Sequence, residues 1–323
     1  MVEVQDGDSQ RTVVVALAVN LIIAVAKASA AMVSGSSALA AEAAHSVADT
    51  GNELFLLVAL QRSGRPADDI HPFGYGAERF YWSLLAAIGI FVAGGLTAIW
   101  EGVRQLQHPR ALEAVGVGYA VLAVSLVLDS TSWRTAYRQL RRESRGRGIP
   151  LRTSLRRSGD PTTPTVFYED TAGVIGVLFA TVGVALHQLT GSAVPDALAS
   201  MAVGVLLVVV AFRLAQRDRE LLTNQSAPPV IVDGIRVLLA AEVGVLDVPR
   251  LEVLIVGPRR WLITGEVAVD GTLPTGTVTG LVEQLRTRLR GEPGVVEAYL
   301  TPVPAAHSRV GRVETARPRS TYG

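Results

Sequence analysis

The chain lacks cysteine altogether and is poor in charge, and both absences narrow its chemistry. With no cysteine in 323 residues, disulfides, thiolate catalysis and cysteine-based metal sites are excluded. Only 18 % of the residues are charged, against roughly 25 % in soluble domains. A metal ion in this protein must therefore be held by histidine, carboxylates or other oxygen ligands.

An excess of one charge sign is also missing, because 30 basic residues stand against 29 acidic ones and give a net charge of +1. A nucleic-acid-binding protein needs a basic excess or a basic stripe, so this balance argues against that class. Lys27 is the single lysine, and every other basic residue is an arginine. Together with abundant Ala, Val and Gly, this bias predicts a GC-rich bacterial genome as the source.

What the sequence does have is hydrophobicity, with 49 % apolar residues and a mean hydropathy of +0.34. Six windows approach the roughly 20 residues that cross a hydrocarbon core; they are 12–34, 38–60, 81–100, 115–133, 171–188 and 193–212. The first window is too long for a signal peptide and lacks a small-residue cleavage site. Because the windows are too long for barrel strands, the sequence predicts six transmembrane helices.

The arginines predict the orientation, since cytoplasmic loops of membrane proteins carry an excess of basic residues. The connection between the fourth and fifth windows contains nine arginines, and that between the second and third contains three. The turn 35–37 and the loop 187–192 contain none. We therefore expect both termini and the two arginine-bearing loops to face the cytoplasm.

After residue 212 the pattern changes to that of a small soluble domain. Residues 228–242 and 277–290 have apolar residues at helical spacing, whereas 251–256, 261–269 and 294–301 are typical of strands. The order αββαβ predicts a compact, ferredoxin-like α+β domain with helices on one sheet face. The expected organisation is a cytoplasmic segment (1–11), a six-helix membrane domain (12–217), a cytoplasmic α+β domain (218–304) and a disordered tail (305–323).

Ionisable residues inside the windows carry the functional signal, because each costs about 2.5–3.5 kcal/mol on insertion scales. His45 and Asp49 lie four residues apart and so share one helical face. An imidazole nitrogen and a carboxylate so placed can share a divalent cation, and the combination suits zinc. The alternative is a His–Asp hydrogen bond that joins helices. Asn52 lies on the same face and is a candidate hydrogen-bond donor to the ligands.

A second acidic pair, Glu169 and Asp170, opens the fifth window. Adjacent helical residues point about 100° apart, so at most one of them aims at a shared site, and acidic residues near a helix N-terminus also favour its macrodipole. Simpler roles are expected for the remaining residues: water contact for Glu42 and Glu53, a pair with Arg134 for Asp129, charge balance or snorkelling for Lys27, and surface exposure for His108 and His187.

These residues stand in motifs that resemble the cation diffusion facilitator family. Residues 36–49, Ser-Ser-Ala-Leu-Ala-Ala-Glu-Ala-Ala-His-Ser-Val-Ala-Asp, are similar to the second helix of that family, and residues 66–76 to the following loop. Residues 91–102 and 196–200 are similar to its third and sixth helices. The resemblance covers residues 12–302. It implies a transporter, homodimeric through its membrane and cytoplasmic domains, that exports zinc or a related divalent ion in exchange for protons.

By the same resemblance, His45 and Asp49 match two of the four usual transport ligands. The family's fifth helix supplies the other two as H-x-x-x-D, but this chain has Glu169 and Asp170 and no histidine there. That pattern is more similar to the branch that contains the mitochondrial zinc transporter. Either acid is expected to complete the site, Asp170 first because it lies deeper and matches the family's aspartate.

The resemblance also implies a metal site in the loop, built by the family from one aspartate and two histidines. Asp68 and His71 match two of these ligands, whereas Tyr75 replaces the second histidine. The cytoplasmic domain contains no histidine between residues 230 and 306. The binuclear zinc site that some relatives have in this domain is therefore expected to be absent.

The leading hypothesis is a proton-coupled exporter of a divalent cation, zinc first, in a bacterial cytoplasmic membrane. One alternative keeps the fold and changes the ion to manganese, iron, cobalt or nickel. Another is a family member that has lost transport and acts as a membrane scaffold or regulator, as the altered fifth-helix motif permits. An intramembrane zinc enzyme is a weaker alternative, because no nucleophile or acid–base constellation accompanies the histidine and aspartate.

Overall fold

The computed structural model describes residues 3–146 and 162–305, which group into two compact units. The first unit contains the chain up to Pro66 and from Ala77 to Thr223, and the second contains Ala67–Gly76 and the chain from Asn224 onwards. The expected disordered tail lies, apart from its first residue, outside the described residues. So do four of the nine arginines between the fourth and fifth windows, namely Arg147, Arg152, Arg156 and Arg157.

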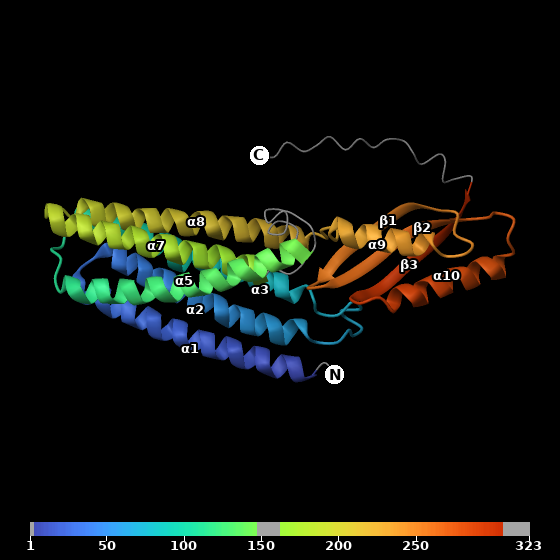
Figure 1. The fold of residues 1–323 in the computed structure, drawn as a ribbon, viewed down its shortest axis with the longest axis horizontal. Coiled ribbons are helices and arrows are strands. Elements are labelled where there is room, and N and C mark those ends of the chain that lie inside the picture. The colour runs from blue at the N-terminus through green and yellow to red at the C-terminus, as the bar shows by residue number, and fades with distance from the viewer. Residues whose placement is uncertain (1–2, 147–161, 306–323) are drawn as a thin grey trace. The chain divides into compact units, whose positions relative to one another are not determined.

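The first unit is a bundle of long helices (Figure 1). Its helices are α1 (Glu3–Ser34), α2 (Ser37–Ser63), the continuous run of α3 (Glu78–Gly89), η1 (Ile90–Leu96) and α4 (Thr97–Gln107), then α5 (Val115–Gly146), α7 (Thr162–Thr190) and α8 (Val194–Leu222). Each predicted window falls on one long helix, and these helices extend beyond the windows. Five of the described helices are long and apolar enough to cross a membrane, whereas α2 carries more polar residues. The predicted class of helical membrane protein is confirmed.

A buried carboxylate fastens the first turns of α2 and α8 together. Asp196, in the first turn of α8, is fully buried and accepts hydrogen bonds from Ser36 Oγ at 2.6 Å and from Ser37 N at 2.7 Å. Ser36 Oγ in turn accepts a hydrogen bond from Leu39 N. Because the first amides of a helix have no partner within it and favour negative charge, Asp196 stabilises the start of α2.

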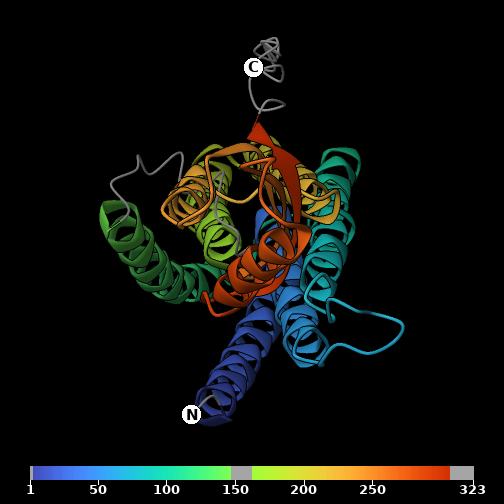
Figure 2. The ribbon, with the colours of Figure 1, turned by 90° about the vertical axis from the view of Figure 1, so that its right-hand side faces the viewer.

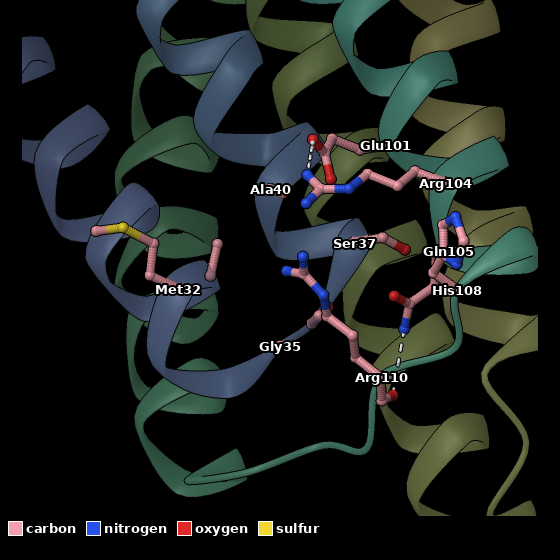
Figure 3. Close-up of a pocket in the computed structure, with 11 residues that line it drawn as sticks. Met32, Gly35, Ser37, Ala40, Glu101, Arg104, Gln105, His108 and Arg110 are labelled. Carbon is pink, nitrogen blue, oxygen red and sulfur yellow. Dashed lines mark hydrogen bonds and ion pairs between the residues drawn. The ribbon is translucent and has the colours of Figure 1, made fainter.

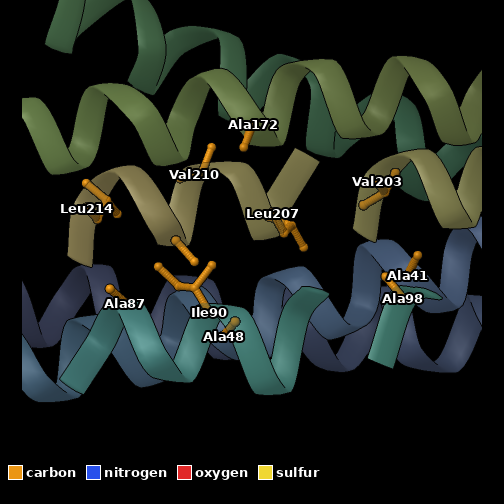
Figure 4. Close-up of a cluster of buried hydrophobic side chains, with 11 residues drawn as sticks. Ala41, Ala48, Ala87, Ile90, Ala98, Ala172, Val203, Leu207, Val210 and Leu214 are labelled. Atoms are coloured by element: carbon orange, nitrogen blue, oxygen red, sulfur yellow. The ribbon is translucent and has the colours of Figure 1, made fainter. Parts of the chain in front are cut away.

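Small residues allow the helices of the bundle to approach closely. A Cβ added at Gly204 of α8 would lie 2.8 Å from the carbonyl oxygen of Gly95 and 2.8 Å from the amide nitrogen of Ile99. Close backbone approach of this kind drives helix association where the hydrophobic effect is weak. The same helices share a cluster of buried apolar side chains with α2 and α7 (Figure 4) that includes Ala41, Ala48, Ile90, Ala98, Ala172, Val203 and Leu207.

The π-helical segment η1 contacts the part of α2 that carries the histidine. A Cβ at Gly94 would lie 3.4 Å from the Cβ of Ala48 and 4.0 Å from the Cα of His45. Single π-helical turns inside α-helices occur often at functional sites. The irregular turn of this helix therefore adjoins the predicted metal ligands.

The outer helices of the bundle present apolar side chains to their surroundings. In Figure 2, α1 and α5 lie at the edge of the helical unit. Ile22 and Met32 of α1 are 69 % and 79 % exposed, and Val127 of α5 is 62 % exposed. Such faces suit contact with lipid, as a membrane-spanning bundle requires.

The second unit has the predicted αββαβ order. It consists of α9 (Pro229–Ala240), β1 (Asp247–Gly257), β2 (Arg260–Val269), α10 (Thr275–Arg290) and β3 (Val295–Pro304). In its sheet, β2 pairs antiparallel with β1 and parallel with β3. Val253, Ile263 and Ala298 lie side by side across the three strands and are fully buried, as are Leu239 of α9 and Leu285 of α10. One sheet face is thus covered, as the alternation of apolar residues predicts.

Candidate metal site

Of the predicted pair of ligands, His45 lies in the interior of the helical unit, and Asp49 is partly exposed, with 27 % of its side chain accessible. Its spacing on α2 brings His45 Nε2 to 3.5 Å from Asp49 Oδ2. His45 is 2 % exposed, and within the described residues neither of its ring nitrogens nor Asp49 Oδ1 has a hydrogen-bond partner. Buried polar atoms without partners are costly, so these atoms are candidates for contact with a ligand. In this state His45 therefore forms no hydrogen bond to another helix within the described residues.

The two acids of α7 turn toward different neighbours. Glu169 Oε2 accepts a hydrogen bond from Asn52 Nδ2 of α2 at 2.8 Å. Asp170 Oδ2 accepts one from Ser132 Oγ of α5 at 2.9 Å. Both carboxylates lie within electrostatic range of Asp49. The wide angle between adjacent helical residues thus places one acid against α2 and the other against α5.

Two glycines of α7 provide space for charged side chains. A Cβ at Gly173 would lie 3.4 Å from Asp129 Oδ2 and 3.6 Å from His45 Nε2. A Cβ at Gly176 would overlap Glu42 Oε1. Because the two glycines are three residues apart, they lie on one face of the helix. We use the term polar seam for the contacts of α2 with α7, namely Asn52 with Glu169, His45 with Gly173 and Glu42 with Gly176.

Asp129 was expected to pair with Arg134, and this expectation is wrong. Its carboxylate lies beside His45 at Gly173, and no ion pair between Asp129 and Arg134 occurs in the part of the chain that the structure describes. Residues five apart on a helix point about 140° away from each other, so the two side chains cannot meet. The signal that identifies Asp129 in the sequence is its position as the sole charge of the fourth window.

Glu42 was expected to reach water, but it is fully buried. Lys27 Nζ of α1 donates a hydrogen bond to Glu42 Oε2 at 2.8 Å, and Lys27 is 1 % exposed. Of the two roles considered for Lys27, charge balance is thus confirmed and snorkelling is wrong. Glu53 likewise accepts a hydrogen bond from Asn20 of α1 at 2.8 Å. Both acids find partners on α1, which covers this face of α2.

His187 also differs from expectation, because it is buried with 4 % exposure instead of lying at the surface. The reason is that α7 continues to Thr190, so that His187 still belongs to a packed helix. Its Nδ1 has no hydrogen-bond partner within the described residues. His187 does not belong to the polar seam.

The donors of the polar seam do not form a closed metal shell in this conformation. Across residues 3–146 and 162–305, no group of three histidine, aspartate or glutamate side chains is placed to hold one metal ion. Tetrahedral zinc sites in proteins use three or four such ligands. A cation at His45 and Asp49 would therefore need water, or a small movement of the acids on α7 or α5, to complete its coordination.

The loop between α2 and α3 brings Asp68, His71 and Tyr75 together at the surface. Asp68 Oδ1 accepts hydrogen bonds from the backbone amides of Ile70 and His71, and Asp68 Oδ2 accepts one from Tyr75 Oη at 2.7 Å. His71 Nδ1 lies 3.7 Å from Asp68 Oδ1. The hydrogen bond from Tyr75 is the main cause that holds the pKa of Asp68 below its ordinary value. Asp68 thus stabilises the loop, because all of these hydrogen bonds come from residues of the loop itself.

A polar cavity of about 180 Å³ lies at the end of the bundle where α1 turns into α2 (Figure 3). Arg104, His108 and Arg110 line it together with the first residues of α2. Arg104 forms an ion pair with Glu101 at 3.3 Å. His108 is exposed, as expected.

Comparison with known proteins agrees with these features. Residues 13–223 match the cation efflux transmembrane domain. The human proton-coupled zinc antiporter SLC30A9, mitochondrial, is 32 % identical over 265 residues, which are 82 % of this chain and 47 % of that protein. Metal tolerance protein C4 of Arabidopsis thaliana is 30 % identical over 272 residues, 84 % of this chain and 60 % of that protein.

A bacterial relative matches more of its own length at lower identity. The cation-efflux pump FieF of Klebsiella pneumoniae is 23 % identical over 262 residues, 80 % of this chain and 81 % of that protein. By contrast, the chain spans about half the length of the human relative.

Proposed function

Because this chain belongs to the cation efflux family, the cation diffusion facilitators, we propose that it carries a divalent metal cation across a membrane. Zinc is the first candidate for the cargo, and protons are the proposed counter-ions. The observation that carries the proposal is a buried histidine, His45, with two unpartnered ring nitrogens beside an aspartate in an integral membrane protein. The names of the human and plant relatives, a zinc antiporter and a metal tolerance protein, support the class of cargo.

In the proposed mechanism, the cation binds to neutral His45, to the Asp49 carboxylate and to one acid of α7, Asp170 or Glu169. Both acids lie within electrostatic range of Asp49, which supports their recruitment. Reorientation of the helices then exposes the site on the opposite side. Protons compete there for the same ligands and displace the metal, because a metal ligand must be deprotonated to bind. Imidazole takes up protons near neutral pH and suits this exchange.

The test is uptake of divalent metals by membrane vesicles under an imposed pH gradient. We expect zinc accumulation that collapses when the gradient is dissipated and that is lost in Asp49→Asn. A panel with manganese, iron, cobalt and nickel identifies the cargo, since an imidazole ligand favours zinc and an all-oxygen shell favours manganese. Zinc uptake that is independent of the gradient would contradict proton coupling and leave metal transport standing.

One observation favours a second candidate, a scaffold or regulator that does not transport. No three donors converge on one point within the described residues, and α7 lacks the histidine that the family pattern supplies. Vesicles that take up no divalent metal, while the protein is folded and dimeric, would support this candidate. Accumulation of any metal of the panel would exclude it.

We further propose that the molecule is a homodimer in a bacterial cytoplasmic membrane, with both termini cytoplasmic. The arginine distribution supports the orientation, and the arginine-rich, lysine-poor composition supports a bacterial source. The α+β domain (218–304) would then belong to the cytoplasm and the membrane domain (12–217) to the bilayer. Asp68 and His71 would form an accessory metal site in the cytoplasmic loop, with Tyr75 in place of a histidine.

A further inference from the structure

The single lysine of the chain is a fixed cation in the interior of the helical unit. Lys27 Nζ lies 2.8 Å from Glu42 Oε2, and both side chains are at least 98 % buried. Opposite charges at such a depth stabilise each other, because little water is present to solvate either of them. The pair joins α1 to α2.

Lys27 donates its hydrogen bond to only one of the two carboxylate oxygens of Glu42, namely Oε2. Glu42 Oε1 has no hydrogen-bond partner within the described residues and faces the space above Gly176 of α7. Three residues further along α2, one helical turn away, His45 also has unpartnered nitrogens. An acceptor oxygen and two imidazole nitrogens are thus buried and unsatisfied on neighbouring turns of the polar seam.

The charge of Lys27 reaches beyond Glu42. Asp49 and Asp129 both lie within electrostatic range of its ammonium group. A metal cation at His45 and Asp49 would therefore be repelled by Lys27, and the burial of Lys27 and His45 limits the screening of this repulsion, whereas Asp49 is 27 % exposed. Glu42 counteracts that repulsion as long as it stays ionised and paired.

We propose that Lys27 is a tethered competitor of the transported cation: its ammonium group neutralises Glu42 in the empty protein and weakens metal binding at His45 and Asp49. The inference rests on the proposed function and adds a regulating residue to its site. A transport site must bind its ion strongly enough to capture it and weakly enough to release it. Several buried carboxylates without a fixed cation would hold a divalent ion too tightly for turnover.

The alternative role for the pair is a structural ion pair that fastens α1 to α2. The two roles predict different changes in metal affinity when either residue is replaced. For a structural pair, loss of either partner weakens the fold, and any effect on metal affinity has the same direction in both variants. For a tethered competitor, loss of the lysine strengthens metal binding and loss of the glutamate weakens it.

The experiment uses the full-length protein in lipid nanodiscs and measures the equilibrium dissociation constant for Zn²⁺ by calorimetry at neutral pH. We expect Lys27→Met to bind Zn²⁺ about tenfold more tightly, because a buried like charge is removed from the neighbourhood of the site. Glu42→Gln leaves the ammonium group uncompensated and should bind about tenfold more weakly. The double variant should return to within about threefold of the wild type, since both charges are gone.

Transport rates and melting temperatures complete the test. Lys27→Met in proteoliposomes should transport Zn²⁺ more slowly than the wild type in spite of its tighter binding, and Lys27→Arg, which keeps the charge, should restore both quantities. If Lys27→Met does not give a folded protein, the Zn²⁺ affinities of the other two variants decide. The inference requires Glu42→Gln to bind Zn²⁺ more weakly than the double variant does. Lowered melting temperatures with unchanged or equally weakened affinity in all variants would overturn the inference.

The outcome also separates this inference from the function on which it rests. A wild-type protein that binds no divalent metal, or an Asp49→Asn variant that binds and transports normally, overturns the proposed site and the competitor with it. If Asp49→Asn abolishes transport while Lys27→Met leaves the Zn²⁺ affinity unchanged, the proposed function stands and the inference about Lys27 alone is wrong.

Discussion

Glu169 and Asp170 are neighbours in the sequence but contact different helices, and substitution of each acid separates their roles. We expect Asp170→Asn to lower zinc uptake about as far as Asp49→Asn, while the protein stays folded. The physical reason is that two ligands are too few for tetrahedral zinc, so that a charge from a facing helix must complete the site. Uptake into vesicles under a pH gradient is the measurement.

Glu169→Gln serves as the matched variant, because it also removes one charge at nearly constant shape. Normal uptake in Asp170→Asn with loss of uptake in Glu169→Gln would show that the acid held by Asn52 is the ligand. Normal uptake in both variants would exclude a site shared between α2 and α7. Reduced uptake in both variants would show that both acids take part in the coordination of the metal.

The surface loop allows a prediction about pH. Tyr75→Phe removes the main cause of the lowered pKa of Asp68, so that this pKa should rise toward its ordinary value. A carboxyl group with a lowered pKa stabilises the folded loop above its ordinary pKa, and this contribution is lost as the pH falls through the lower value. The hydrogen bond from Tyr75 should thus stabilise the wild-type loop at neutral pH and lose this effect in acid, so that Tyr75→Phe loosens the loop at neutral pH and makes little difference in acid. Titration of the carboxyl carbon by NMR measures the shift, and equal pKa values in both proteins would contradict it.

Residues differ in how far the sequence alone predicts their partners. The contact between His45 and Asp49 is local, because a spacing of four on a helix brings side chains together whatever surrounds them. The partners of Glu42 and Asp129 depend on which helices are neighbours. The sequence identifies both acids as charges in apolar windows. Nothing in it, however, predicts that Glu42 contacts Lys27 of α1 or that Asp129 contacts Gly173 of α7.

At the scale of the helices, close contact between α4 and α8 leads to the next prediction. Gly204→Ala would place a methyl group 2.8 Å from backbone atoms of Gly95 and Ile99, which cannot move without the helix. We expect a loss of about 1–3 kcal/mol of stability, as for other overpacked sites. The melting temperature of the purified protein in detergent measures this loss.

Gly51→Ala is the matched control, because this glycine also lies inside a long helix but has nothing within 4 Å of its added Cβ. That substitution should leave the melting temperature unchanged or raise it, since alanine favours helix by up to about 1 kcal/mol over glycine. Equal effects of the two substitutions would show that the contact of α4 with α8 is not tight.

Secondary structure was predicted where the apolar pattern is long and missed where it depends on hydrogen bonding. The six windows and the αββαβ order appear in the structure, because composition and periodicity determine them. The ends of α1, α5 and α7 lie beyond the windows, since polar residues continue a helix outside the hydrocarbon. The π-helical turn η1 has no hydrophobic period of its own, so only Gly94 and Gly95 hint at it.

For the whole molecule, the orientation is a prediction that the absence of cysteine makes easy to test. We expect Arg145→Cys, near the end of α5, to resist an impermeant thiol reagent in intact cells, because arginine-rich loops stay in the cytoplasm. Leu189→Cys, in the last turn of α7, is the control for the opposite side of the membrane; Leu189 is 82 % exposed, and a cysteine there should be labelled rapidly. The reverse pattern would overturn the orientation, and no native thiol would obscure either result.

The α+β unit should dimerise without metal. Several of its apolar side chains are exposed, among them Val237 at 69 %, Val243 at 89 % and Leu246 at 61 %, and such a surface indicates a protein partner. A metal-dependent contact lacks its best ligand, since the described part of this unit has no histidine after His71. Two of its carboxylates are engaged in ion pairs: Glu242 pairs with Arg288, and Glu252 with Arg250.

Sedimentation of fragment 220–305 tests this expectation, with chelator and with zinc. The fragment should be a dimer in both, and Leu246→Glu should weaken its association at least about tenfold, because a buried charge would replace an apolar contact. Thr277→Glu introduces the same charge at an exposed polar position in the first turn of α10 and should leave the dimer intact. A fragment that is monomeric with chelator and dimeric only with zinc would mean that carboxylates replace the missing histidines, and that metal concentration controls assembly of the whole molecule.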